Sequence, residues 1–230
     1  MDTLNAIAII SLIIGFLCAL IIAIHIIAGN QQKMMIMNFV YPITGLYTGP
    51  LALLFYFVIG KKSSKKNMEQ QQKANRKVEH EKKPFWQSVV IGTLHCGSGC
   101  TLGDILAEIF LAIIPVVIFG SSLAGKWTID YVFAFIIGIV FQYYSIKPMK
   151  NLSPKKGLIA ALKADTLSLT AWQVGMYGGM AIAFFVIFKR RLEPTSILFW
   201  FVMQGAMLLG FITSFPVNWW LLTRGIKEVM

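Results

Sequence analysis

The sequence predicts an all-α membrane protein, a polytopic bundle of six transmembrane helices. Of the 230 residues, 57% are hydrophobic and only 13% are charged, and the mean hydropathy is +0.68. Soluble domains carry about 25% charged residues. Apolar runs of about 20 residues, the length needed to cross a hydrocarbon core of about 30 Å, recur along the chain. Together these observations exclude a soluble globular protein.

Residues 1–60 are predicted to form a first membrane hairpin. The run from Leu4 to Ala28 is long enough to span, and it lacks the basic n-region of a signal peptide, so we expect a retained anchor. A second span is predicted over about 35–60. It contains Pro42 and Pro50, which predict kinks or an unwound stretch.

Residues 61–83 are predicted to be a basic cytoplasmic linker. This stretch holds nine Lys or Arg against three Glu and almost no apolar residues. We expect it to contact anionic lipids. The basic residues of the chain flank spans instead of lining one face, so no nucleic-acid partner is expected.

Residues 84–230 are predicted to form a four-helix membrane core. The apolar stretch from Pro84 to Gly120 is too long for one straight span, and Gly97 and Gly99 are the expected break. The fifth segment is also too long, with a helix start at Ser153-Pro154 and an interfacial piece before the span. The third and fifth segments are therefore expected to be broken or re-entrant. The four spans are predicted at about 101–119, 128–146, 166–188 and 197–219.

The distribution of Lys and Arg predicts the orientation. With six spans, sixteen of these residues fall on the side of the 61–83 linker and five on the other. Cytoplasmic loops are the basic ones. Both termini are therefore expected to be cytoplasmic.

The strongest local pattern is the sequence HCGSGC, which contains His95, Cys96 and Cys100. Cys and His ligands suit Cu(I) or Zn(II), so these three residues are candidate metal ligands and a copper or zinc ion is the candidate cofactor. On a helix, Asp104 and Glu108 would continue the stripe of Cys96 and Cys100 as an ion or proton pathway. The alternative is packing, with cysteines as small hydrophobic residues and Gly-Ser-Gly as a close helix contact.

A second polar group lies at the inner mouth of the fifth span. Thr166, Thr170 and Gln173 share one helix face and, with Asn218 of the sixth span, could line a polar cavity. As an alternative, these side chains only join helices to one another.

Asp165 precedes this group and could pair with Lys163 or with a lysine of the preceding loop. We expect it to converge with Asp104 and Glu108 in the inner half of the bundle, an arrangement that suits a cation.

With these residues in view, the chain resembles an uncharacterised family of bacterial multi-helix membrane proteins, the domain of unknown function family 4396. The resemblance lies in TLHCGSGCTLGDI (Thr93–Ile105), LIAALKADTLSLTAWQVGMYG (Leu158–Gly178) and SFPVNWWLLTRGIKE (Ser214–Glu228), with MNFVYPITGLYTGP (Met37–Pro50) similar as well. It implies a bacterial inner-membrane protein and no particular activity.

Three functions remain open on the sequence. The leading hypothesis is binding and transport of a soft transition-metal cation, Cu(I) being the best candidate. The alternatives are membrane thiol-redox or electron-transfer chemistry, and a non-catalytic assembly or scaffold subunit. Expected protein partners are a metal chaperone or redox partner, and a second copy of the chain. No GxSxG, Walker A, HExxH or GxGxxG motif occurs in a suitable context, so catalytic and cofactor-binding residues are not predicted.

Overall fold

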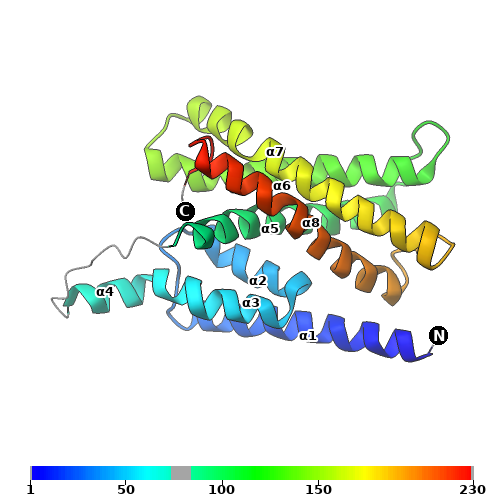
Figure 1. The fold of residues 1–230 in the computed structure, drawn as a ribbon, viewed down its shortest axis with the longest axis horizontal. Coiled ribbons are helices and arrows are strands. Elements are labelled where there is room, and N and C mark those ends of the chain that lie inside the picture. The colour runs from blue at the N-terminus through cyan, green and yellow to red at the C-terminus, as the bar shows by residue number, and fades with distance from the viewer. Residues whose placement is uncertain (1, 74–83, 229–230) are drawn as a thin grey trace.

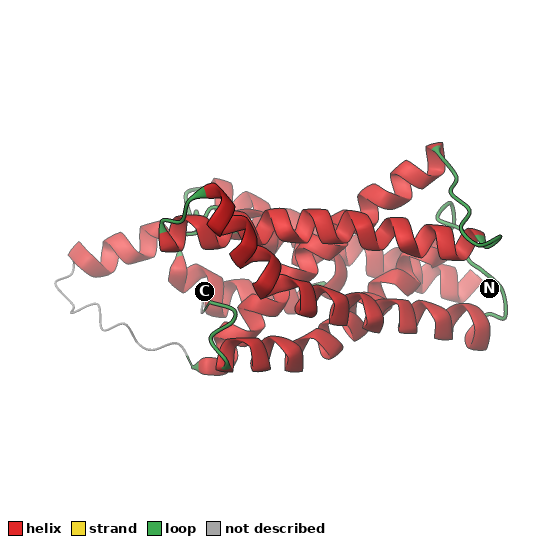
Figure 2. Cartoon of the chain, turned by 90° about the horizontal axis from the view of Figure 1, so that it is seen from above, coloured by secondary structure: helices red, strands yellow, loops and turns green. Residues whose placement is uncertain are grey.

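The computed structural model describes residues 2–73 and 84–228, and the secondary structure of these parts is helical (Figure 2). Five helices are long and apolar enough to span a membrane, which supports the predicted multi-pass membrane protein. They are α1 (Asp2–Ile27), α5 (Phe85–Ile113), α6 (Ser122–Lys150), α7 (Pro154–Ala181, continued by the π-helix Ile182–Ile187) and α8 (Ile197–Thr223).

The second predicted span is a broken helix. It consists of α2 (Met37–Thr48), α3 (Pro50–Phe55) and the π-helix Tyr56–Gly60. Between α2 and α3, Gly49 adopts φ 56°, a left-handed conformation that glycine tolerates best. The predicted interruption is therefore present, and it reverses the direction of the chain (Figure 1).

The two ends of this broken helix meet. The backbone N–H of Lys33 donates to Ser63 O at 3.3 Å, and the N–H of Lys65 donates to Gln31 O at 2.8 Å. A segment whose ends are hydrogen-bonded to each other enters and leaves at the same end of the bundle. Residues 37–60 are thus a re-entrant hairpin, and the prediction of six spans is not confirmed.

The two ends of the described chain lie at opposite ends of the bundle (Figure 1). The five long helices alternate in direction, so the start of α1 and the end of α8 are separated by the length of the bundle. This arrangement does not match the prediction that both termini lie on one side. The cause is the re-entrant hairpin, which removes one crossing.

The third segment is not broken. Helix α5 runs without interruption through the glycines of the HCGSGC motif, where Gly97 packs against Trp172 of α7 and Gly99 packs against α6. An ideal Cβ at Gly99 would lie 2.8 Å from Gly138 Cα, and one at Gly103 would lie 2.4 Å from Ala134 Cα. Two small residues four apart on each helix thus let the backbones approach, as in other membrane helix pairs.

The fifth segment is continuous as well. It begins at Pro154, preceded by Ser153, as predicted, but no side-chain cap hydrogen bond forms there. Helix α7 then passes directly into the π-helix Ile182–Ile187. The expected interfacial piece is therefore the first part of one long helix.

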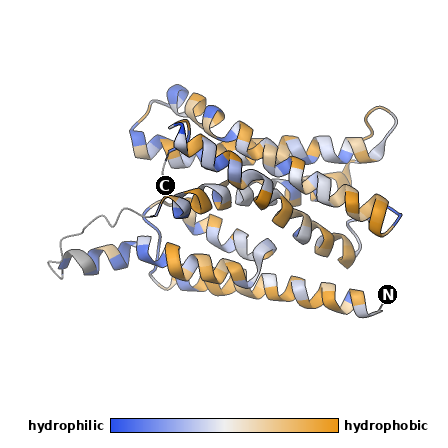
Figure 3. Cartoon of the chain, in the orientation of Figure 1, coloured by the Kyte–Doolittle hydropathy of each residue, from blue (hydrophilic) through white to orange (hydrophobic). Residues whose placement is uncertain are grey.

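The remaining helices surround this core. Helix α5 packs on α6, α7 and α8; α2 lies between α1 and α5, and α3 packs on α1 and α2. Most side chains of α1 are exposed, as expected for a lipid-facing helix. In the predicted linker, α4 (Lys65–Lys73) is hydrophilic (Figure 3), and residues 74–83 lie outside the described residues.

Candidate functional site

Helix α5 carries buried polar side chains along most of its length. At about 1.5 Å per residue, Gly92 and Glu108 are about 24 Å apart along the axis, against a hydrocarbon core of about 30 Å. The polar and sulfur-bearing side chains between them are at least 95% buried: Thr93, His95, Cys96, Ser98, Cys100, Thr101 and Asp104, with Glu108 at the end. They fall into three groups.

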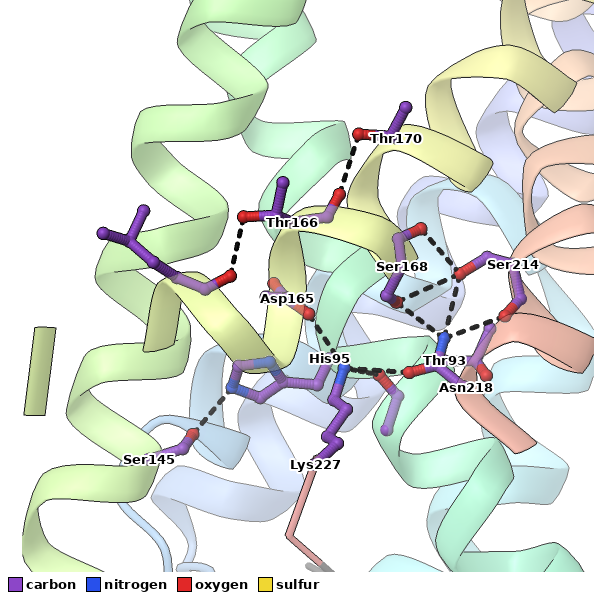
Figure 4. A network of polar contacts seen from close by, with 12 residues as sticks. Thr93, His95, Ser145, Asp165, Thr166, Ser168, Thr170, Ser214, Asn218 and Lys227 are labelled. Atoms are coloured by element: carbon purple, nitrogen blue, oxygen red, sulfur yellow. Dashed lines mark hydrogen bonds and ion pairs between the residues drawn. The ribbon is translucent and has the colours of Figure 1, made fainter. Parts of the chain in front are cut away.

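The first group, here called the Lys227 cluster, lies near the start of α5 (Figure 4). It consists of Asp165 and Ser168 on α7, Ser214 and Asn218 on α8, and Lys227 beyond α8. Lys227 Nζ donates to Asp165 Oδ1 at 2.8 Å and to Asn218 Oδ1 at 2.9 Å. Asn218 Nδ2 donates to Ser168 Oγ at 2.7 Å and to Ser214 Oγ at 2.9 Å. All five side chains are buried.

His95 lies beside this cluster but does not join it by a hydrogen bond. Its Nε2 is 2.7 Å from Ser145 Oγ on α6, and its ring meets Phe141 edge-on. His95 Nδ1 and Asp165 Oδ2, on facing helices, have no hydrogen-bond partner within the described residues (Figure 4).

The second group contains the two cysteines of the motif. Cys96 and Cys100 are free thiols, fully buried in one apolar cluster with Tyr47, Trp172 and Met207. Met176, Met180 and Met203 belong to the same cluster. The two thiols and the four methionines of this apolar cluster are here called the sulfur-rich cluster.

The re-entrant hairpin closes this middle group. Thr44 Oγ1 lies 3.2 Å from Ser98 Oγ, and the Ser98 hydroxyl donates to Val40 O at 3.0 Å. Tyr47 packs its ring edge-on against Trp172, with centroids 5.5 Å apart. Thus the hairpin covers the HCGSGC motif at mid-depth.

The third group, here called the acid cluster, lies toward the other end of the bundle. It consists of Asp104 and Glu108 on α5 and Asp130 on α6, each at least 95% buried. Asp104 Oδ1 accepts a hydrogen bond from Gln173 Nε2 at 3.1 Å. Each of the three carboxyl groups has one oxygen without a hydrogen-bond partner in residues 2–73 and 84–228.

Two of these acids line a cavity of about 30 Å³. Glu108 and Asp130 face it together with Trp127 and Tyr177, whose rings stack with centroids 5.1 Å apart. The residues around the cavity also include the exposed ion pair of Lys126 with Glu193, at 2.9 Å. This volume can hold a single water molecule or a small ion.

Along the whole bundle, ten buried side-chain nitrogen or oxygen atoms have no hydrogen-bond partner among the described residues. Native interiors normally satisfy such atoms with protein groups or ordered water. They belong to Tyr47, His95, Asp104, Glu108, Asp130, Gln142 (both atoms), Asp165, Trp172 and Gln173. Ordered water is the usual partner of such atoms in a protein interior.

The part of the chain that forms these clusters matches the model of a known protein family. The model of the domain of unknown function DUF4396 matches residues 85–227, more than half of the chain. The chain belongs to the DUF4396 family. No curated protein and no solved structure matches the chain.

The DUF4396 domain contains both polar clusters and the motif. It begins with α5 and ends at Lys227, so the family region includes every residue of the Lys227 cluster and the acid cluster. The hairpin α2–α3 precedes the matched region. The Met37–Pro50 part of the predicted resemblance is thus outside the match.

The predicted metal ligands of the DUF4396 domain do not come together. Among the described residues there is no group of three or more His, Cys, Asp or Glu side chains that could hold a metal ion. On a continuous helix, His95 projects about 100° away from the adjacent Cys96. His95 accordingly contacts Ser145 while Cys96 and Cys100 lie in the sulfur-rich cluster.

The three predicted pathway acids of the DUF4396 domain do not converge either. Asp165 pairs with Lys227 at 2.8 Å, whereas Asp104 accepts a hydrogen bond from Gln173 at 3.1 Å, and the described residues contain no group of three or more His, Cys, Asp or Glu side chains that could hold a metal ion. Asp104 and Glu108 instead share their end of the bundle with Asp130.

The predicted polar cavity is divided in the same way. Gln173 donates a hydrogen bond to Asp104 of the acid cluster, and Asn218 accepts one from Lys227. Thr166 and Thr170 are only partly buried, and their hydroxyls donate to carbonyls of their own helix at 2.6 and 2.7 Å. These two threonines contribute helix contacts, including that of Thr170 with Tyr131 at 2.9 Å.

Sequence reasoning missed two charged residues of the DUF4396 domain that the structure brings into these clusters, and the two serines of the Lys227 cluster. The sequence does contain a feature that could have identified Asp130, because this residue is an acid near the start of a span. No such feature identifies Lys227, because a lysine after the last span is expected from the positive-inside rule alone. It replaces Lys163 as the partner of Asp165.

Proposed function

We propose that this DUF4396 protein moves a cation across the membrane in exchange for protons, through the bundle α5–α8. The observation that carries the proposal is the acid cluster, three buried carboxyl groups that each have an oxygen without a partner among the described residues. Ionised carboxylates are costly at membrane depth unless they bind a proton or a cation. Alternating between these two states is the step that such an exchange requires.

The arrangement of the clusters supports a route through the bundle. The acid cluster has a small cavity at one end, the Lys227 cluster lies at the other, and Gln142 and His95 lie on helices α6 and α5 between them with unpartnered polar atoms. A re-entrant broken helix at mid-depth is typical of proteins that form a path for solutes. The hairpin α2–α3 has this form.

The orientation follows from the five crossings. When the re-entrant hairpin is taken into account, thirteen of the seventeen lysines and arginines in residues 2–73 and 84–228 fall at the end that carries α4 and the end of α8. Hydrophilic residues colour this end in Figure 3. By the positive-inside rule it faces the cytoplasm of the bacterial inner membrane, with the N-terminus outside. The acid cluster then opens outward.

Proton exchange can be measured in vesicles. With the purified protein in liposomes that hold a pH-sensitive dye, an imposed gradient of Na⁺ or K⁺ should drive protons in the opposite direction. Asp104→Asn should reduce this flux at least about tenfold, because it removes the buried proton site that Gln173 positions. The matched control is Glu69→Gln on the exposed helix α4, which should transport like the natural protein. Equal fluxes from Asp104→Asn and Glu69→Gln would contradict the proposal.

A soft metal ion such as Cu(I) is the second candidate for the cargo. The observation that favours it is the sulfur-rich cluster, an apolar cluster that contains Cys96, Cys100 and four methionines, three of which line the cavity of the acid cluster. Thiolate and thioether sulfurs select Cu(I). In this version the two cysteines bind the ion without His95.

Metal content distinguishes this candidate. After purification with copper under reducing conditions, the natural protein should retain about one copper per chain, and Cys96→Ser/Cys100→Ser should lose it. Cys18→Ser is the control, since this thiol is also buried but lies on α1 outside the cluster. No copper in any of the three proteins would exclude the soft-metal cargo, and leave thiol redox chemistry to be tested by titration with oxidant.

A further inference from the structure

The ammonium group of Lys227 lies in a cage of oxygen atoms. Its three acceptors are Asp165 Oδ1 at 2.8 Å, Asn218 Oδ1 at 2.9 Å and Gly92 O at 3.3 Å. They come from α7, α8 and α5, respectively. An ammonium has three donors, so this cage satisfies it completely, and both charged side chains are fully buried.

The cage is organised by groups other than the lysine. The Asn218 amide donates from Nδ2 to Ser168 and Ser214, so its oxygen must face the opposite way, toward the cage. Ser214 Oγ in turn donates to Ser168 O at 3.0 Å, which joins α7 to α8. A carboxylate, an amide oxygen and a backbone carbonyl are thus held together, and these are ligands that a hard cation prefers.

The lysine reaches the cage from a short terminal segment. Helix α8 ends at Thr223, Gly225 adopts φ 65°, and the N–H of Ile226 donates back to Leu221 O at 3.0 Å. This turn brings the chain back toward the helices, so that the Lys227 side chain enters the bundle. Outside the cage, the segment has an ion pair of Glu228 with Lys150, whose side chains are 31% and 48% exposed.

The segment also borders open space. A surface hollow of about 270 Å³ is lined by residues of the segment, including Ile226 and Glu228, and by residues of α6 and α7. Exposed ion pairs contribute little, and salt weakens them further. The buried contacts of Lys227 are therefore the principal polar attachment of the segment to the bundle.

We propose that Asp165, Asn218 and the carbonyl of Gly92 form a binding site for a monovalent inorganic cation at the cytoplasmic end, and that Lys227 occupies it as a tethered competitor. An ammonium carries the same single charge as Na⁺ or K⁺, so one can replace the other without leaving Asp165 uncompensated. The cation enters as Lys227 leaves through the hollow beside the segment. This inference deepens the proposed exchange by naming the class of its cation.

Cation-dependent stability of the purified protein tests the site. Thermal unfolding in detergent is compared in NaCl, KCl and N-methylglucamine chloride at equal ionic strength. Lys227→Met should unfold about 3 to 6 °C higher in Na⁺ or K⁺ when the ion exceeds its Kd tenfold, whereas the natural protein should show a smaller shift. The double variant Asp165→Leu/Lys227→Met should lose the shift. Equal unfolding temperatures for Lys227→Met in the three salts would overturn the inference.

A measurement on the natural protein keeps the test independent of how well the variants fold. Acetylation of Lys227, followed by mass spectrometry, should accelerate several-fold as Na⁺ or K⁺ replaces N-methylglucamine, while the exposed Lys62 reacts at one rate throughout. If the rate of Lys227 acetylation is the same in all three salts, displacement of the lysine by a cation is refuted. Neither measurement involves transport, so a binding site without proton flux would contradict only the exchange, and flux without a binding site would contradict only this inference.

Discussion

Lys227→Met is expected to lower the free energy of unfolding by about 3–5 kcal/mol, the range found when one partner of a buried ion pair is removed. The reason is that Asp165 lies within helix α7 and is fully buried, so its carboxylate cannot reach water once Lys227 is gone. Thermal or denaturant unfolding of the purified protein in detergent, in N-methylglucamine chloride, measures the loss.

Removing the acid instead of the lysine should lower the free energy of unfolding by less. In Asp165→Leu, Lys227 can swing out with the terminal segment, because the turn at Gly225 and the hollow beside it lead to solvent. The double variant Asp165→Leu/Lys227→Met should recover most of the stability, since replacing both charges by apolar groups is often neutral. A double variant as unstable as Lys227→Met would show that the pair does not act as a unit.

Gly103→Leu is expected to prevent the close contact of α5 with α6. Even the Cβ of the new side chain would lie 2.4 Å from Ala134 Cα, and a backbone atom cannot move aside as a flexible side chain can. Overpacked sites cost about 1–3 kcal/mol and occasionally more, and this site belongs at the upper end. The fraction of protein that stays monodisperse after heating in detergent should fall sharply.

Gly178→Leu is the matched control for this substitution. Gly178 also lies within a long helix, α7, but it is exposed and has no atom within 4 Å of its ideal Cβ position among the described residues. A leucine there contacts lipid or detergent, which is as apolar as the side chain. Gly178→Leu should therefore remain as stable as the natural protein. If Gly103→Leu and Gly178→Leu lose equal stability, the close contact of α5 with α6 is not the cause of the loss.

The sequence by itself determined the membrane class and the helices. The length and hydropathy of the apolar runs identified four of the five long helices within a few residues at one end or both, because spanning a bilayer constrains each segment locally. Pro50 also indicated the break in the second segment, since proline cannot continue the preceding helix, whereas Pro42 lies inside the continuous helix α2. The acids Asp104, Glu108 and Asp165 were recognised for the same reason, as charges in apolar surroundings.

Only the tertiary structure decided what these local features do. Gly97 and Gly99 can break a helix or let another helix approach, and the contacts of Gly97 with Trp172 on α7 and of Gly99 with α6 favour the second outcome. The direction of the chain after Gly49 depends on the pairing of residues 31–33 with residues 63–65, which no local pattern encodes. The partner of Asp165 lies 62 residues away, where Lys227 resembles any cytoplasmic lysine until the helices α5, α7 and α8 enclose it.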